Sequence, residues 1–524
     1  MKKVSKSPEI IFGLVAPIGT QIQPFQNHLE HLLKKMNYEM KIIRITDCLE
    51  KLLPKNRNLK KIKSLNTYYK MEACTAYRKM KGPGYFAGLA LKQIQTVRSK
   101  TVNKRTAYLI VQLKNVAEHE ILQKTYGENY IQISCFSNYE NRKKTLQKKY
   151  QKDPKISQKI RELANQTTET LKNIDHNMAF NYHKLQPEII NNLLQKDFAD
   201  FEHPEKDTAI KTHGQGISTL FDKSHFFVNL DQPSQSIKAQ IKKIVDLLFG
   251  QHEEYPTADE FGMAVAYNIA RRSNFPGDRQ VGACIVSEHG EIISAGSIRA
   301  PASHANPKKS GQDSIQNSYE QQLQRRNRFK NLITEIKTKT KHLDEQDKNA
   351  LEQLKQFIHN NLEFHPCTHA EMSAISDAAK LGVSIRGATL YSTTFPCHMC
   401  SKDIITSGIN KVVFLEAFPK SKNEELYSKV IDIDPNQQSP NKVPFYTFFG
   451  VGPKRYNTLY SLENSQTLRK RSVQNPKPKK NLIPPLLKFR VSDFYEHVET
   501  TIIKHINRGK KTPDPSFVFR DLLY

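Results

Sequence analysis

One histidine and two cysteines in this sequence have the types and the spacing of zinc ligands. His369 begins the segment HAEMSAISDAAK, and Cys397 and Cys400 lie in the segment PCHMC. Zinc prefers imidazole nitrogen and thiolate sulfur, and three protein ligands leave the fourth tetrahedral position open to water. Because structural zinc sites are closed, the open position indicates catalysis, with a purely structural zinc as the alternative.

Helix geometry is compatible with a single site. Cys397 and Cys400, three residues apart, can share one face of a first helical turn, where the positive helix end favours thiolates. His369 and Glu371 are two residues apart, so their spacing alone does not bring both to one metal. At a helix N-terminus, however, side chains lean toward the open end, and a glutamate is long enough to reach a water there.

The first half of the chain alternates apolar strands with helical patterns. An apolar run, a tight turn, a helix from Pro24 to Met36 and a second strand form a βαβ opening. This alternation predicts a mostly parallel α/β sheet over roughly residues 8 to 250. The predicted strands are residues 9–17, 41–46, 107–114, 130–136 and 225–230, and a further helix covers 117–127.

A second pattern of helices and strands begins near Pro256 and predicts a new domain. A helix at 258–273 precedes strands at 282–288 and 291–297, and a strand at 388–394 separates the two pieces of the zinc motif. Residues from about 306 to 361 are polar and rich in Gln and Asn, which indicates a surface insertion. The predicted domains are therefore 1–250, 251–461 with this insertion, and a C-terminal extension at 462–524.

Length and composition predict a multidomain protein of the cytoplasm. A chain of 524 residues with 38% hydrophobic residues can build two or three domains. The longest apolar run, Ile10 to Ile18, is too short for a membrane helix, and the first ten residues have no long apolar segment. Seven sparse cysteines indicate metal binding or burial rather than disulfides.

The strong positive charge favours polyanionic partners. A formal charge of +28 would attract nucleic acid or phosphorylated metabolites, although a general lysine bias explains it equally well. Between Glu463 and Asp493 there is no acidic residue, and the prolines there argue against a helix. The basic residues of this stretch are Arg469, Lys470, Arg471, Lys477, Lys479, Lys480, Lys488 and Arg490.

The motif resembles that of the zinc-dependent cytidine and deoxycytidylate deaminases, H-x-E followed by P-C-x-x-C. The matching segments are HAE and TTFPCHMC. RQVGACIV, SGINKVVFLEAFPKS and FFGVGPKRY resemble the bacterial two-domain dCTP/dCMP deaminases associated with phage defence. IIFGLVAPIGT, RTAYLIVQLKNVAEHEILQKTYG and HGQ with HFFVNL resemble their P-loop-like N-terminal half, so the likeness spans most of residues 8 to 460.

The resemblance implies a P-loop-NTPase-like α/β domain followed by a cytidine-deaminase-like α/β/α domain. Zn2+ would be held by His369, Cys397 and Cys400, with Glu371 as the catalytic proton carrier. The reaction would convert dCTP to dUTP, dCMP to dUMP, or both, and would deplete the dCTP pool in antiphage defence. The N-terminal domain would control activity, with an inhibitory small RNA or a nucleotide as regulator and a homo-oligomer as the assembly.

Two departures from the family pattern bear on ligand binding. The chain reads GSIRAP, and this alignment places Ile298 where related deaminases carry a sugar-binding Asn. Unless the alignment is shifted, either Arg299 replaces the Asn by reaching toward sugar or phosphate, or the substrate and activity differ from those of the family. The first turn has Gly13, Gly19 and Thr20 but no P-loop lysine, which argues against phosphoryl transfer. Backbone amides could still bind a phosphate there, with a simple strand-to-helix turn as the alternative.

Two other functions compete with deamination of free nucleotides. A polynucleotide cytidine deaminase would use the basic charge, although the basic tail has no interleaved aromatic residues for base stacking. A catalytically impaired zinc-binding sensor would account for Ile298.

Overall fold

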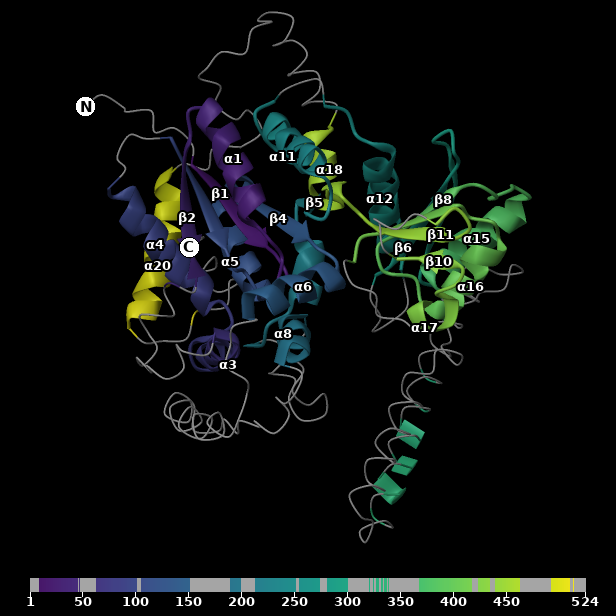
Figure 1. The fold of residues 1–524 in the computed structure, drawn as a ribbon, viewed down its shortest axis with the longest axis horizontal. Coiled ribbons are helices and arrows are strands. Elements are labelled where there is room, and N and C mark those ends of the chain that lie inside the picture. The colour runs from purple at the N-terminus through teal and green to yellow at the C-terminus, as the bar shows by residue number, and fades with distance from the viewer. Residues whose placement is uncertain are drawn as a thin grey trace, which may run out of the picture. The chain divides into compact units, whose positions relative to one another are not determined.

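The computed structural model contains two compact units. The first is formed by Met1–Glu260 and Phe449–Tyr524, and the second by Phe261–Phe448 (Figure 1). Residues 449–461, predicted to belong to the second domain, are therefore part of the first unit. The structure describes residues 9–45, 47, 63–100, 105–150, 189–198, 213–250, 254–273, 280–299, 320, 324, 327–328, 331–332, 334–336, 338, 367–416, 423–433, 439–461, 492–508 and 512. The predicted insertion lies largely outside them, and so do the basic residues from Arg469 to Arg490.

A six-stranded, mostly parallel sheet organises the first unit. Its order is β12-β5-β4-β1-β3-β2, and only β12 runs antiparallel to its neighbour. Strands β1, β3 and β4 are buried along their whole length, as expected for a parallel sheet covered on both faces. The strands are β1 (Ile10–Val15), β2 (Glu39–Arg44), β3 (Thr106–Val111), β4 (Tyr130–Phe136), β5 (Phe226–Asn229) and β12 (Gly450–Val451). The strands predicted in this part of the sequence are all present.

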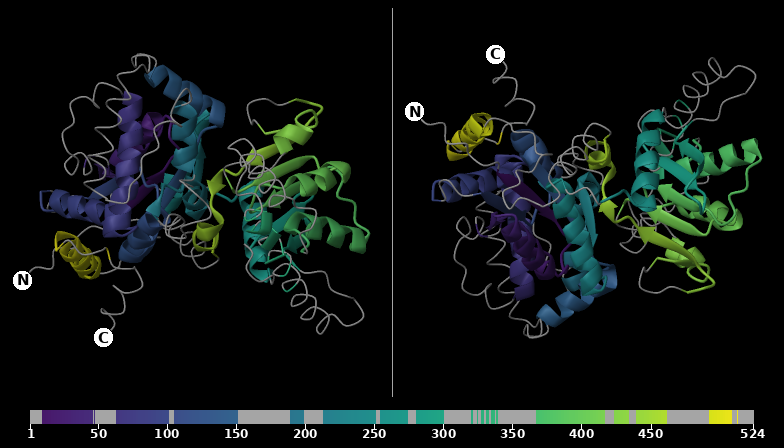
Figure 2. Two further views of the ribbon diagram at one scale, coloured as in Figure 1. Left: turned by 90° about the horizontal axis from the view of Figure 1, so that it is seen from below. Right: turned by 90° about the horizontal axis from the view of Figure 1, so that it is seen from above.

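Helices cover both faces of this sheet (Figure 2). Helices α1 and α11 pack on the face that carries Ile10, Phe12 and Leu14, where Phe25 and Leu29 enter the core. Helices α4, α5 and α20 pack on one another, and the buried Glu499 of α20 accepts hydrogen bonds from Arg98. The helices of this unit are α1 (Gln23–Lys35), α3 (Lys63–Lys81), α4 (Tyr85–Arg98), α5 (Val116–Tyr126), α6 (Tyr139–Tyr150), α8 (Ile189–Phe198), α10 (Ile217–Leu220), α11 (Ser234–Leu248), α18 (Pro453–Leu459) and α20 (Ser492–Asn507).

The second unit is built on a mixed six-stranded sheet. Its order is β10-β11-β9-β8-β6-β7, parallel from β10 to β8 and antiparallel from β8 to β7. The strands are β6 (Gly282–Val286), β7 (Ile292–Ser297), β8 (Thr389–Ser392), β9 (Lys411–Phe414), β10 (Ile431–Asp432) and β11 (Val443–Thr447). The helices are α12 (Ala258–Ile269), which begins in the first unit, α15 (Ala370–Leu381), α16 (His398–Thr406) and α17 (Asn423–Tyr427).

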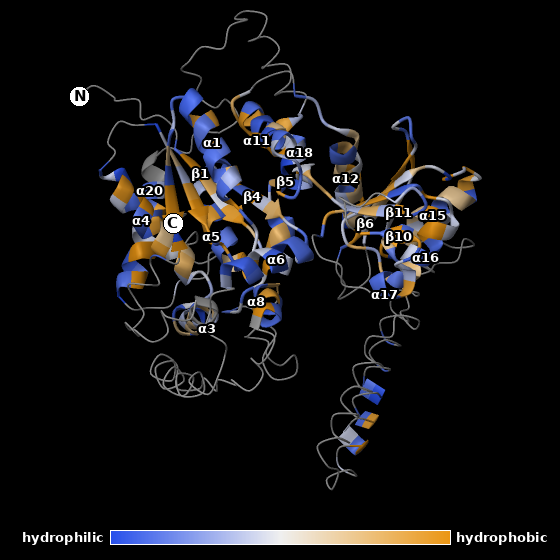
Figure 3. Ribbon diagram, viewed as in Figure 1, coloured by the Kyte–Doolittle hydropathy of each residue, from blue (hydrophilic) through white to orange (hydrophobic). Residues whose placement is uncertain are grey.

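Apolar residues concentrate in the strands, and polar residues cover the outer sides of the helices (Figure 3). In the second unit, Leu390, Val412 and Phe414 of the sheet pack with Ala374 of α15 and Ile404 of α16. These two helices therefore share one face of the sheet, and they carry the zinc motif. Within the described part of the chain, no helix combines the length and hydropathy that crossing a membrane requires.

A glycine on β7 allows α15 to lie close to the sheet. A Cβ atom on Gly296 would stand 2.3 Å from the carbonyl oxygen of Ala370 and 2.4 Å from the amide nitrogen of Ala374. Both contacts are with helix backbone, which cannot turn aside as a flexible side chain could. Gly296 therefore sets the distance between β7 and the first turn of α15, the turn that follows His369.

Gly296→Ala is expected to destabilise the second unit by about 1–3 kcal/mol, because the added methyl group must push α15 outward. The effect is measured by unfolding the protein in urea and monitoring the release of bound zinc. Ala295→Ser is the matched control, since the neighbouring side chain points to the opposite face of the sheet. Equal zinc retention in both variants would show that Gly296 does not set this distance.

Candidate active site

His369 lies at the N-terminus of α15. Residue 368 pairs with Arg299 in an isolated antiparallel bridge, and His369 follows as the residue that caps the helix. The helix ends at Leu381, and the capping residue Gly382 has a φ of +66°, the left-handed conformation that glycine adopts readily. Ala370 and Ala374 are small and fully buried, so this face of the helix can lie against β7.

The two cysteines belong to the first turn of α16. Cys397 is the N-cap residue, and its sulfur accepts a hydrogen bond from the backbone amide of Cys400 at 3.5 Å. The loop before it is fixed by Asn423, whose buried side chain donates to the carbonyl oxygen of Pro396 at 2.9 Å and to Ser401 Oγ at 2.7 Å. This loop therefore presents both sulfur atoms toward α15.

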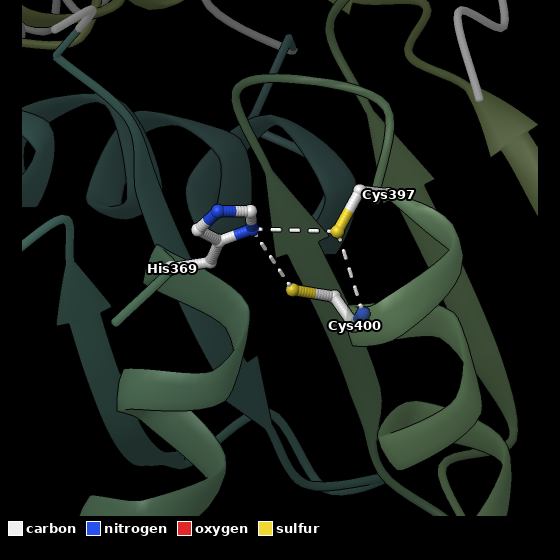
Figure 4. A group of neighbouring side chains, drawn as sticks. All are labelled: His369, Cys397 and Cys400. Carbon is white, nitrogen blue, oxygen red and sulfur yellow. Dashed lines mark hydrogen bonds between the residues drawn. The ribbon is translucent and has the colours of Figure 1, made fainter. Parts of the chain in front are cut away.

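The three predicted ligands converge on one point (Figure 4). His369 Nδ1 lies 3.3 Å from the sulfur of Cys397 and 3.5 Å from that of Cys400. A tetrahedral zinc with bonds of about 2.0 Å to nitrogen and about 2.3 Å to sulfur places these atoms roughly 3.5 Å apart. The distances therefore fit zinc, and within the described ranges no further His, Cys, Asp or Glu joins the group.

The environment of the cysteines favours a thiolate. A hydrogen bond from the Cys400 thiol, reinforced by His369 and by the backbone amide of Cys400, lowers the pKa of Cys397, whereas the same hydrogen bond and burial raise the pKa of Cys400. Thiolate is the form that binds a metal, so Cys397 is prepared for zinc at neutral pH.

Glu371 is buried beside this group. Glu371 is only 3% exposed, and its Oε1 accepts a hydrogen bond from Ser392 Oγ at 3.0 Å. Burial raises the pKa of Glu371, and the neighbouring Cys397 thiolate adds to the increase. A raised pKa makes the Glu371 carboxylate a stronger proton acceptor, which suits a group that takes a proton and passes it on.

Ser392 and Asn423 are site residues that sequence reasoning missed. Ser392 ends β8 and orients the Glu371 carboxylate, and Asn423 begins α17 and holds the cysteine loop. Neither belongs to a motif. The one signal in the sequence was that Ser392 falls within the strand predicted between the two motif pieces.

Arg299 and Ile298 lie beside the zinc ligands. Arg299 pairs through its backbone with Thr368, which precedes His369, and Ile298 packs in the cluster that contains Cys400. The guanidinium of Arg299 pairs with Asp377 Oδ1 at 2.7 Å, in the second half of α15. Ile298 is 8% exposed and packs in the hydrophobic core of the second unit. Ile298 therefore serves packing in this structure, and the polar contact of an Asn has no counterpart at this position.

The three first-turn residues predicted to bind nucleotide, Gly13, Gly19 and Thr20, do not all line one cavity. Gly13 lies inside β1, where a Cβ atom would stand 2.4 Å from the Tyr130 hydroxyl, so its small size serves packing. Gly19, with a φ of +89°, and Thr20 both line a cavity beyond the end of β1. A Cβ atom on Gly19 would meet the backbone oxygen of Arg142 at 2.6 Å, so any substitution there disturbs the fold as well as the cavity.

Comparison with known proteins agrees with the geometry of the zinc ligands. Residues 256–416 match the family described as the cytidine and deoxycytidylate deaminase zinc-binding region. The deoxycytidylate deaminase of Enterobacteria phage T2 is 52% identical over 54 residues, which are 10% of this chain and 29% of that enzyme. The deoxycytidylate deaminase of Mus musculus is 28% identical over 170 residues, 32% of this chain and 71% of that enzyme.

A solved structure, the apo dCMP deaminase of cyanophage S-TIM5, covers 37% of this chain and 100% of its own, at 18% identity and a TM-score of 0.21. That likeness is too weak to support an argument. The sequence matches and the ligand geometry together show that a cytidine and deoxycytidylate deaminase zinc-binding domain is present and that zinc is its cofactor.

Proposed function

We propose that the zinc-binding deaminase domain of this chain removes the amino group of a free deoxycytidine nucleotide by hydrolysis, converting dCMP to dUMP, dCTP to dUTP, or both. The observation that carries the proposal is the convergence of His369, Cys397 and Cys400 next to the buried carboxyl of Glu371. The matched stretches of the phage and mouse enzymes, both named deoxycytidylate deaminases, support the substrate class.

In this proposal Glu371 carries out the proton transfers. Zinc held by the three ligands would supply the acidity that makes water a nucleophile near neutral pH. Glu371 would accept a proton as water attacks C4 of cytosine, deliver it to N3, and pass a proton to the leaving amine, so that ammonia departs. The hydrogen bond from Ser392 Oγ holds one carboxylate oxygen in place during these transfers.

We also propose that the first unit regulates the second. In this proposal a small RNA or a nucleotide restrains the enzyme, which acts in the cytoplasm as a homo-oligomer and depletes the dCTP pool during antiphage defence. The sequence resemblance described above is the support for this role. Gly13, Gly19, Thr20 and Arg299 stay proposed nucleotide contacts, although Gly13 also packs against Tyr130 and Arg299 also pairs with Asp377.

A direct substrate comparison tests the proposal. We expect the purified, zinc-loaded chain to deaminate dCMP or dCTP and to leave cytosine in single-stranded DNA and RNA unchanged, as measured by mass spectrometry. Deamination of the polynucleotides alone would instead support the alternative suggested by the formal charge of +28. No product from any substrate would favour a zinc-binding sensor, the alternative that Ile298 motivates.

A further inference from the structure

A cavity of about 340 Å³ lies in the first unit at the carboxyl ends of parallel strands β1, β2 and β3. Ligands of open α/β sheets bind at this edge, where the strands end and the loops begin. The turn after β1 forms one wall, with Ile18, Gly19 and Thr20. Helix α3 and the residues after β3 form further walls.

The cavity already holds one anionic group, the carboxylate of Asp197. Asp197 Oδ2 accepts a hydrogen bond from the backbone amide of Ile18 at 2.7 Å, and Oδ1 pairs with Lys114 Nζ at 2.6 Å. Lys114 also donates to the carbonyl oxygen of Ala16 at 2.9 Å, which holds its ammonium group against the turn. A backbone amide at a turn after a strand and a lysine are the donors that proteins use for phosphate groups.

The charges around the cavity are mostly positive. Lys70, Arg78, Lys114 and Lys149 line it, and Asp197 is the one acidic residue among its lining residues in the described part of the chain. Arg78 forms a buried ion pair with Glu118, so its charge is matched. Lys149 and Lys114, the partner of Asp197, bring two positive charges against the single carboxylate of the lining, which favours a ligand with more negative charge than Asp197 brings.

The Thr20 side chain adds a buried hydroxyl group to the cavity lining. Its oxygen has no hydrogen-bond partner in the described part of the structure. A buried hydroxyl without a partner is costly, and an anion in the cavity would supply an acceptor for it. Thr20 was one of the residues that the sequence marked as a nucleotide contact.

Asp197 is carried by a helix that packs outside the main core. Helix α8 rests in a small cluster formed by Met71, Leu146, Tyr150, Leu193 and Leu194, apart from the large cluster beneath the sheet. A buried ion pair between Lys196 and Glu72 also ties α8 to α3. A helix held by a small satellite cluster detaches at a lower free-energy cost than a helix packed in the main core.

We propose that this cavity binds a small polyphosphate anion and that Asp197 is its internal competitor. The carboxylate of Asp197 occupies the place of one phosphate group, paired with the Ile18 amide and Lys114, until the ligand displaces it together with the C-terminal end of α8. The proposal concerns the first unit and does not depend on the reaction proposed for the second.

Asp197→Asn tests the competition. The amide keeps the size of the side chain but removes its charge, so inorganic tripolyphosphate is expected to bind at least about tenfold more tightly in calorimetric titration of the full chain. Glu30→Gln, an exposed residue of α1, is the matched control for the change in net charge. In the double variant Asp197→Asn/Lys114→Gln the gain is expected to disappear. Equal affinities in Asp197→Asn and Glu30→Gln would overturn the proposal.

Hydrogen exchange in the unaltered protein provides a second measurement that needs no variant. Tripolyphosphate is expected to accelerate amide exchange in residues 189–198, because displacing Asp197 removes a tie that holds α8. Exchange that stays unchanged or slows in α8 when the anion binds would contradict displacement. Absence of binding to both the parent and Asp197→Asn would show that the cavity is not an anion site.

Discussion

Glu371→Gln is expected to retain its zinc and to lose deamination by at least about a hundredfold. The amide has nearly the shape of the carboxylate and can still accept the hydrogen bond from Ser392, but it cannot carry the proton from water to the cytosine ring. Zinc content by elemental analysis and the rate of uracil nucleotide formation measure the two effects separately.

The control for this variant is Glu288→Gln, whose side chain is 76% exposed in the turn between β6 and β7. It removes the same charge from the same unit and is expected to deaminate at the parental rate. Activity near the parental level in Glu371→Gln would remove Glu371 from the mechanism, and loss of zinc would make it a ligand instead of a proton carrier.

The double variant Cys397→Ala/Cys400→Ala is expected to lose both zinc and activity, whereas the parent should contain about one zinc per chain. With both sulfur atoms gone, His369 would be the one remaining member of the ligand group, and a single imidazole cannot hold the metal against a chelator. Elemental analysis after dialysis against a mild chelator measures the loss.

Cys74→Ala, in α3 of the first unit, is the matched control and is expected to keep its zinc. Zinc retained at the parental level in the double variant would mean that the metal is bound elsewhere. Zinc lost from both variants would point to general unfolding, which circular dichroism of the same samples would reveal.

The zinc ligands could be predicted from the sequence because their chemistry is local. Cys397 and Cys400 occupy one helical turn, and the H-x-E motif is read directly from three consecutive letters. The hydrogen bonds that position them are not local. Ser392 is 21 residues from Glu371, and Asn423 is 27 residues from Pro396, so no spacing rule connects them.

The fold shows the same division between local and long-range information. Buried parallel strands have continuous apolar sequences, so β1, β3 and β4 were predictable. The two-residue strand Gly450–Val451 has no such pattern, and its pairing with β5 joins residues more than two hundred positions apart. Because of this pairing, residues 449–461 belong to the first unit. Local sequence could not predict that assignment.

Gly13 illustrates how one residue type can carry two meanings. A glycine after an apolar run and before a turn is typical of a phosphate-binding loop, and the sequence predicts that role for Gly13. In the structure Gly13 is within the strand, and the Tyr130 hydroxyl fills the space where a side chain would lie. The packing partner comes from β4, which the local sequence around Gly13 does not contain.

We propose that water replaces the amino group of a deoxycytidine nucleotide in the second unit. The most direct measurement is incubation of the zinc-loaded protein with dCMP and dCTP in water labelled with oxygen-18, followed by mass spectrometry of the nucleotides. We expect a uracil nucleotide that carries the label on its base, formed by the parent and not by Glu371→Gln. Unchanged dCMP and dCTP, or a uracil product without the label, would contradict the claim.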